Sequence, residues 1–163
     1  MNAPLPAALK FDLQGLVRSI AHNHAFDSFN SNLNALQWEA LTGYLQPFAL
    51  VQGQVLIEQG GNDRSVYFVE SGSLSVHYED EKKRVRLAIV GPGSVVGEGA
   101  FFSHLPRTAT VQAAAASKLW CLTPIRFTEL SNRKPEIALE ISMALGGIVS
   151  RRLANRPKRV AVT

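Results

Sequence analysis

Residues 48 to 122 alternate between apolar and polar in short runs, and glycine-rich turns separate the runs. Side chains of a β-strand point alternately to its two faces, so this two-residue period predicts strands. The predicted strands cover residues 48–51, 55–58, 65–70, 74–79, 85–90, 94–96, 108–113 and 118–122. Many short strands at this spacing are typical of a β-sandwich or β-barrel, so we expect a mainly β domain.

Helical patterns flank the β region on its N-terminal side. The apolar residues between positions 11 and 20 fall on one face of a helix. A second helix is expected to begin at Asn34, which can form a capping box with Gln37.

Two further helices are predicted after the strands. Thr123 can cap a short helix that has Pro124 in its first turn, and Pro135 opens a longer helix that runs to about residue 155. Adjacent glycines, Gly146 and Gly147, interrupt the longer helix, and each lowers helix stability by about 1 kcal/mol. A close crossing with another element, a hinge, or simple tolerance would each explain the pair.

The composition limits the class of protein to which the chain can belong. The chain has 163 residues, of which 46% are hydrophobic and 18% charged, as expected for one soluble globular domain. Its formal net charge of +4 favours anionic partners but does not by itself indicate a nucleic-acid binder. A single cysteine, Cys121, allows neither an intrachain disulfide nor a cysteine-based metal site. No signal peptide or long apolar run is present, so we expect a cytoplasmic protein without a membrane span.

We expect three parts along the chain. Residues 1–33 would form an N-terminal helical extension, 34–134 the β region with its flanking helices, and 135–163 a C-terminal helix with a basic tail. All charged residues after Glu140 are basic, which suits a solvated helix end or contact with a ligand or acidic partner.

The segment from residue 97 to 110 has the chemistry of a ligand site. Gly97 and Gly99 allow the backbone to approach a ligand closely, and a helical turn over 100–103 would offer unpaired N–H groups to an anion. Arg107 offers a planar fork of donors that suits a phosphate, whereas ionised Glu98 can only accept and suits sugar hydroxyls. Together these groups could hold a small ligand with one phosphate, a hydroxylated sugar and a flat apolar base.

The pattern Gly97-Glu98, a short helix, then the run 106–110 (Pro-Arg-Thr-Ala-Thr) resembles the phosphate-binding cassette of cyclic nucleotide-binding domains. These domains occur in the catabolite activator family, in the regulatory subunits of protein kinase A and in gated ion channels. The resemblance implies a β-roll (a double-stranded, jelly-roll-like β-helix) with N-terminal helices and a C-terminal helix pair. It places Gly60 and Gly72 in turns between strands of the roll.

The resemblance also implies roles for single residues. Arg107 would bind the cyclic phosphate, helped by backbone N–H groups and Thr108, and Glu98 would accept from the ribose 2′-hydroxyl. An apolar wall on the strands would face the base, and Arg152 or Leu153 at the end of the long helix would cover it. The implied ligand-binding residues are Gly97, Glu98, Gly99, Ala100, Arg107, Thr108, Ala109, Val85, Leu87, Val96, Arg152 and Leu153.

The expected function is a cyclic nucleotide sensor that signals by movement of its C-terminal helix. The ligand would be cAMP or cGMP without a metal; Thr108 is compatible with both, and we favour cAMP. The expected partner is a protein effector or a second copy bound through the C-terminal helix. No helix-turn-helix follows the long helix, so direct DNA binding is not expected.

Two alternatives remain open. The same fold could bind cyclic di-GMP or act as a protein-interaction module, although intact Glu98 and Arg107 argue against loss of the ligand. An enzyme on a cupin-like barrel is suggested by the turn at residues 91–93, but such sites need clustered ligands, and His77 and His104 are isolated. We therefore expect a protein that is not an enzyme.

Overall fold

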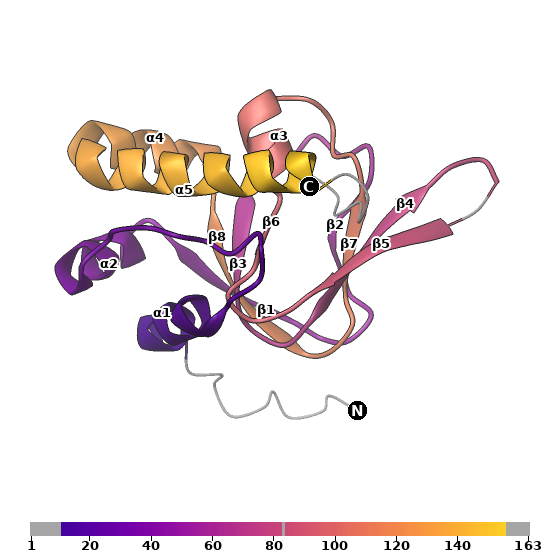
Figure 1. Cartoon of the computed structure of the whole chain (residues 1–163), viewed down its shortest axis with the longest axis horizontal. Coiled ribbons are helices and arrows are strands. Elements are labelled where there is room, and N and C mark those ends of the chain that lie inside the picture. Colours follow the sequence, from indigo (N-terminus) through magenta and orange to yellow (C-terminus); the bar gives the residue numbers. More distant parts are fainter. Residues whose placement is uncertain (1–10, 83, 156–163) are drawn as a thin grey trace, which may run out of the picture.

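The computed structural model describes residues 11–82 and 84–155. Its strands form two four-stranded antiparallel sheets, and the helices gather at one end of them (Figure 1). The architecture is a mainly β, jelly-roll-like roll with an N-terminal helix and C-terminal helices, as the sequence predicted.

Each sheet mixes strands that lie far apart in the chain. The first has the order β1 (Gln46–Leu50), β8 (Ser117–Leu122), β3 (Val66–Ser71) and β6 (Val95–Val96). The second has the order β2 (Val55–Ile57), β7 (Thr110–Ala113), β4 (Leu74–Glu79) and β5 (Arg84–Val90). Strands β4 and β5 form a hairpin that projects from the body of the molecule (Figure 1).

The second, fourth and fifth helices begin where the sequence predicted, whereas the cassette helix begins at Glu98, two residues before the predicted turn over 100–103. The helices are α1 (Leu13–His22), α2 (Ala35–Thr42), α3 (Glu98–Ser103), α4 (Pro124–Arg133) and α5 (Pro135–Ala154). The Asn34 side chain accepts from the Gln37 backbone N–H at 2.9 Å, and the Gln37 side chain accepts from the Asn34 N–H at 3.0 Å, which completes the capping box. Thr123 caps α4 through a single hydrogen bond, in which its side chain accepts from the backbone N–H of Arg126 at 3.2 Å. Helix α5 runs without a break through both glycines.

The largest apolar core lies between the first sheet and the helices. It contains Leu16 of α1, Phe68 of β3, Trp120 of β8 and Ile141 of α5, so residues from all three predicted parts of the chain pack together. A second cluster, which includes Val76 of β4, fills the inside of the roll.

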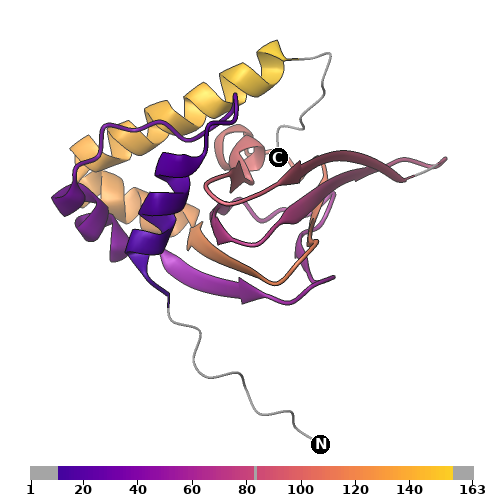
Figure 2. The same ribbon diagram turned by 60° about the horizontal axis from the view of Figure 1, so that its bottom comes forward.

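Residues 23–34, which we call the strap, run alongside α5 (Figure 2). The Arg151 guanidinium of α5 donates to the Ser28 carbonyl at 2.8 Å, and Glu140 accepts from the Asn32 N–H at 3.0 Å. Phe29 of the strap is buried edge-on against Phe68 at 5.3 Å between ring centroids. The strap therefore fastens α5 to the rest of the molecule. Within residues 11–82 and 84–155, no helix is both long and apolar enough to cross a membrane.

Candidate functional site

The connection from β6 to β7 contains the cassette predicted from the sequence. Gly97 links β6 to α3 with a φ of 89°, in the left-handed region that favours glycine. A Cβ built on Gly97 would lie 2.6 Å from the Ser65 carbonyl oxygen and 2.9 Å from Nη1 of Arg107. Position 97 therefore requires a glycine, because its backbone lies very close to Ser65 and to the cassette arginine, Arg107.

Arg107 is 3% exposed, and its guanidinium is directed into the protein. Nη1 donates to the Gly97 carbonyl at 2.8 Å, while Nη2 donates to Asp63 at 2.8 Å and to the Ser65 carbonyl at 2.6 Å. Nε is buried and has no hydrogen-bond partner among the described residues. Burial raises the pKa of Asp63, but the hydrogen bonds from Arg107 and Ser65 outweigh it and hold that pKa below its usual value. Arg107 is thus a pre-positioned buried cation whose Nε has no partner among the described residues.

Glu98 belongs to a second buried cluster. It is 0% exposed, and Nη1 of Arg152 donates to its carboxylate at 2.5 Å. Arg152, itself 3% exposed, donates through Nε to Asp27 at 2.8 Å and through Nη2 to the Val95 carbonyl at 2.9 Å. Burial lowers the pKa of Arg152, but the charges and hydrogen bonds of Glu98 and Asp27 reverse the shift and raise it. This cluster joins the strap, the cassette and the last turns of α5.

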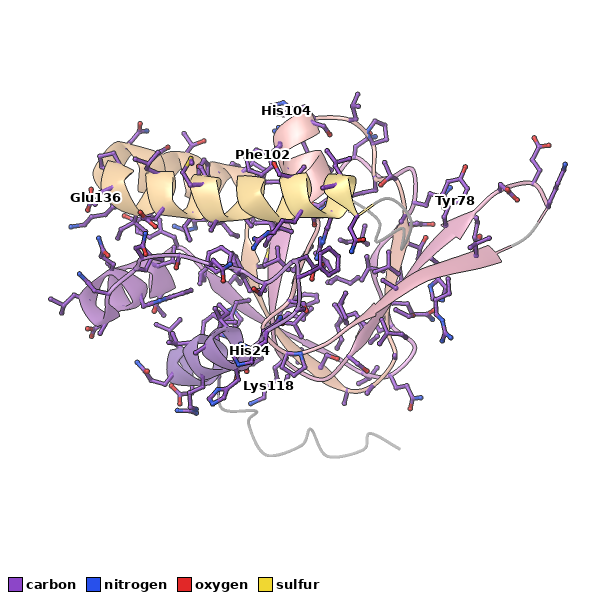
Figure 3. All side chains as sticks on the ribbon, viewed as in Figure 1. His24, Tyr78, Phe102, His104, Lys118 and Glu136 are labelled. Carbon is purple, nitrogen blue, oxygen red and sulfur yellow. The ribbon has the colours of Figure 1, made fainter. Side chains whose placement is uncertain are left out.

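A cleft of about 350 Å³ lies beside the cassette. Three of the predicted phosphate-binding residues line it: Gly99, Ala100 and Thr108. Its other lining residues are mainly apolar: Phe102, Ser103, Leu105, Pro106 and Val149. Figure 3 shows Phe102 on α3 beside α5. Residues of the cassette and of the long helix α5 therefore line the same cleft.

The remaining predicted residues have different environments. Val96 and Ala109 are buried in the cassette region, and Leu153 is exposed on the last turn of α5. Val85 is half-buried on β5, opposite Tyr78 in the hairpin, and the side chain of Leu87 lies outside what the structure describes. The residues predicted to contact phosphate and ribose are thus close in the fold. Of the predicted base wall, Val96 lies beside them on β6, whereas Val85 and Leu87 lie on the β4–β5 hairpin.

Sequence reasoning missed three residues of these clusters: Asp27, Asp63 and Ser65. Each lies in a polar stretch without a motif, and the two aspartates pair with arginines 125 and 44 residues away. No local pattern marks them, so only the folded arrangement identifies them. Within the described part of the chain, no three His, Cys, Asp or Glu side chains group in a way that could hold a metal ion.

Comparison with known proteins decides the family. A family model described as the cyclic nucleotide-binding domain matches residues 48–134, which is more than half of the chain. The chain belongs to the cyclic nucleotide-binding domain family. The resemblance in the cassette is thereby confirmed, and the chain is a cyclic nucleotide-binding regulatory domain.

Individual members of the family match over most of this chain. A cAMP-dependent protein kinase regulatory subunit of Yarrowia lipolytica is 33% identical over 118 residues, which are 72% of this chain and 29% of the relative. A cGMP-dependent protein kinase of Plasmodium berghei is 31% identical over 107 residues, which are 63% of this chain and 12% of the relative. A solved cyclic nucleotide-binding domain from Methylobacillus flagellatus has the same fold, with a TM-score of 0.76 and 17% identity over 91% of this chain and 85% of that one. The chain spans less than a third of the length of these curated relatives.

Proposed function

We propose that this domain is a sensor for a 3′,5′-cyclic mononucleotide and that it passes the signal on through α5. The observation that carries the proposal is Arg107, a buried arginine in the family cassette with an unpartnered Nε. A buried cation with an unused donor favours an incoming anion, because an unsatisfied buried polar group costs free energy. Backbone N–H groups of Gly99 and Ala100 would add donors to the same phosphate.

The ribose and base have candidate partners on the strands and α5. Glu98 would accept from the ribose 2′-hydroxyl, and it is already bonded to Arg152 of α5. Ribose contact at Glu98 would therefore act directly on the group that holds the last turns of α5. Val85, Leu87 and Val96 would face the base. Leu153, which is exposed, would cover the base without breaking an ion pair, whereas Arg152 would first have to leave its ion pairs.

We favour cAMP over cGMP as the ligand. The relatives reported above include kinase proteins named for each nucleotide, and Thr108 is compatible with both. Cyclic di-GMP, or use of the fold as a protein-interaction module, is the alternative. A binding domain of this kind has no need of catalysis or metal. It would act in the cytoplasm on a protein partner, either an effector or a second copy of the chain.

Calorimetric titration with cAMP, cGMP and cyclic di-GMP tests the proposal. Arg107→Ala should weaken binding of the preferred nucleotide by at least tenfold, because losing a buried charged contact costs about 2–5 kcal/mol. Arg107→Lys should recover only part of this loss, since it restores the charge without the planar fork.

Arg126→Ala is the matched control, because Arg126 is an exposed arginine that pairs with Glu129 at the surface of α4. Thermal melts of all variants establish that they are folded. The proposal fails if no cyclic mononucleotide binds, or if folded Arg107→Ala binds as tightly as Arg126→Ala.

A further inference from the structure

The turn over residues 58–61 follows β2 and contacts the cassette arginine through its backbone. The Gly61 N–H donates to the Glu58 carbonyl at 3.0 Å, which closes the turn, and Gly60 has a φ of 83°, where glycine is favoured. The Gly60 N–H donates to the Arg107 carbonyl at 2.8 Å, and the Arg107 N–H donates to the Gly61 carbonyl at 2.8 Å. These two bonds fix the main chain that carries the Arg107 guanidinium.

The side chain of the same turn, that of Gln59, holds the backbone of the β4–β5 hairpin. Its Nε2 donates to the Glu79 carbonyl at 2.8 Å, and its Oε1 accepts from the Glu79 N–H at 2.8 Å. The amide thus satisfies both backbone groups of one residue of β4, as a neighbouring strand would. Next to Glu79 on β4 is Tyr78, which pairs with Val85 of the predicted base wall.

Gln59 contacts the hairpin where β7 no longer supports it. Strand β7 pairs with β4 from Leu74 to His77, and the last pair joins His77 to Thr110. The Gln59 N–H donates to Oγ1 of Thr110 at 3.1 Å, so Gln59 directly follows the end of this ladder. Beyond His77 the described part of the hairpin is two-stranded and projects from the body (Figure 1). A two-stranded hairpin alone is marginally stable in water, so the contact with Gln59 should restrict its movement.

From these contacts we propose that Gln59 is a positioning residue for the base of the bound nucleotide. The turn over 58–61 holds two parts of the site in a fixed relation: Arg107, which would bind the phosphate, and the hairpin, whose Val85 would face the base. This role rests on the proposed function, because it concerns the base of the same ligand. A pre-ordered hairpin loses less conformational freedom when it packs on the base, so the contacts of Gln59 increase affinity and base selectivity.

Gln59→Met tests this role, because methionine has nearly the same length as glutamine and lacks the amide. Calorimetric titration with cAMP, cGMP and cCMP should show the dissociation constant of the preferred nucleotide rising by about five- to tenfold, as expected when two hydrogen bonds are lost. The three dissociation constants should also become more similar, because a mobile hairpin discriminates less among bases. Gln59→Glu keeps the acceptor for the Glu79 N–H but loses the donor, so its loss should be smaller.

Gln112→Met is the matched control. Gln112 is another half-buried glutamine of the same sheet, and its Nε2 donates to the Gly53 carbonyl at 2.7 Å, in the turn that precedes β2. This variant should leave all three dissociation constants unchanged, and thermal melts establish that the variants are folded. If Gln59→Met weakens all three nucleotides by the same factor, or no more than Gln112→Met does, Gln59 does not position the base.

Amide hydrogen exchange of the ligand-free protein tests the hairpin contact separately. In Gln59→Met the Glu79 amide should exchange faster, because it has lost its acceptor, whereas the Arg107 amide should keep its native rate. Equal exchange at Glu79 would overturn the role of Gln59. Normal binding with unchanged base selectivity in Gln59→Met would overturn it while leaving the proposed function intact. If the native protein binds none of the three nucleotides, the proposed function fails and this role fails with it.

Discussion

The two buried arginines of the site differ in how fully they are bonded. All three guanidinium nitrogens of Arg152 donate to the protein, to Asp27, Glu98 and the Val95 carbonyl. Arg107 also bonds to the protein but keeps Nε unpartnered among the described residues. Arg152 is therefore suited to holding elements together, and Arg107 to receiving an anion.

Replacing Glu98 tests the structural part of this distinction. Glu98→Gln removes one charge from a buried ion cluster and should lower the free energy of unfolding by about 3 kcal/mol, as when a buried pair loses one partner. Glu129→Gln is the control, because Glu129 pairs with Arg126 at the surface and such pairs are worth less than about 1 kcal/mol. Urea unfolding of both variants gives the comparison.

The cost of Glu98→Gln should fall or change sign when Arg152 is replaced by Met, because the buried carboxylate then has no cation to neutralise it. If Glu98→Gln is as mild as Glu129→Gln in the native background, the cluster does not stabilise the fold.

At the scale of the element, α5 has two differently anchored halves. Ile137, Ile141, Leu145 and Ile148 are almost completely buried in the main core, so the first four turns are part of the fold. The last turns are held mainly by polar contacts of Arg151 and Arg152 with the strap and the cassette. Apolar anchoring resists local opening more than a few polar contacts do, so any movement of α5 should be confined to its C-terminal end.

Hydrogen exchange should detect that movement. With saturating cyclic nucleotide, backbone amides of residues 148–155 should become more protected, because a ligand that touches both Glu98 and the helix end favours the closed arrangement. Amides of residues 137–145 should exchange equally slowly with and without the ligand.

Arg107→Ala under the same nucleotide concentration supplies the control and should show no added protection. Equal exchange of residues 148–155 in the presence and absence of ligand, under conditions where calorimetry shows saturation, would contradict a moving helix end.

At the scale of the whole molecule, the N-terminal segment is part of the main core. Leu16 of α1 is fully buried, Phe29 of the strap packs on Phe68, and Trp38 of α2 lies in the same cluster as α5. A shared core couples these elements, so they should unfold together.

Leu16→Ala should therefore destabilise the entire domain, by about 2–5 kcal/mol as in other buried leucine truncations. Tryptophan fluorescence, from Trp38 and Trp120, and far-ultraviolet circular dichroism should report one common transition at a lower denaturant midpoint. Leu36→Ala is the control, since Leu36 is largely exposed on α2 and should change stability by less than about 0.5 kcal/mol. Two separated transitions in Leu16→Ala would show that the N-terminal segment unfolds on its own.

The sequence by itself determined the approximate positions of the strands, the starts of α2, α4 and α5, and the cassette. These features depend on residues only a few positions apart, so they can be predicted without knowledge of the fold. They are the apolar–polar alternation of the strands, the capping box at Asn34, the cap at Thr123, and Pro135 at the start of α5. The Gly97-Glu98 and 106–110 pattern is local for the same reason, and the family match confirms it.

Only the tertiary structure decided which charges meet. Arg152 lies 54 residues from Glu98 and 125 from Asp27, and Arg107 lies 44 from Asp63. Such pairs form because the fold brings the strap, the cassette and α5 close together. No pattern among neighbouring residues in the sequence predicts this arrangement. The fold also distinguishes the two glycines of α5, which the sequence treats alike: a Cβ at Gly147 would lie 3.4 Å from Nη2 of Arg151, whereas a Cβ at Gly146 would meet no atom within 4 Å.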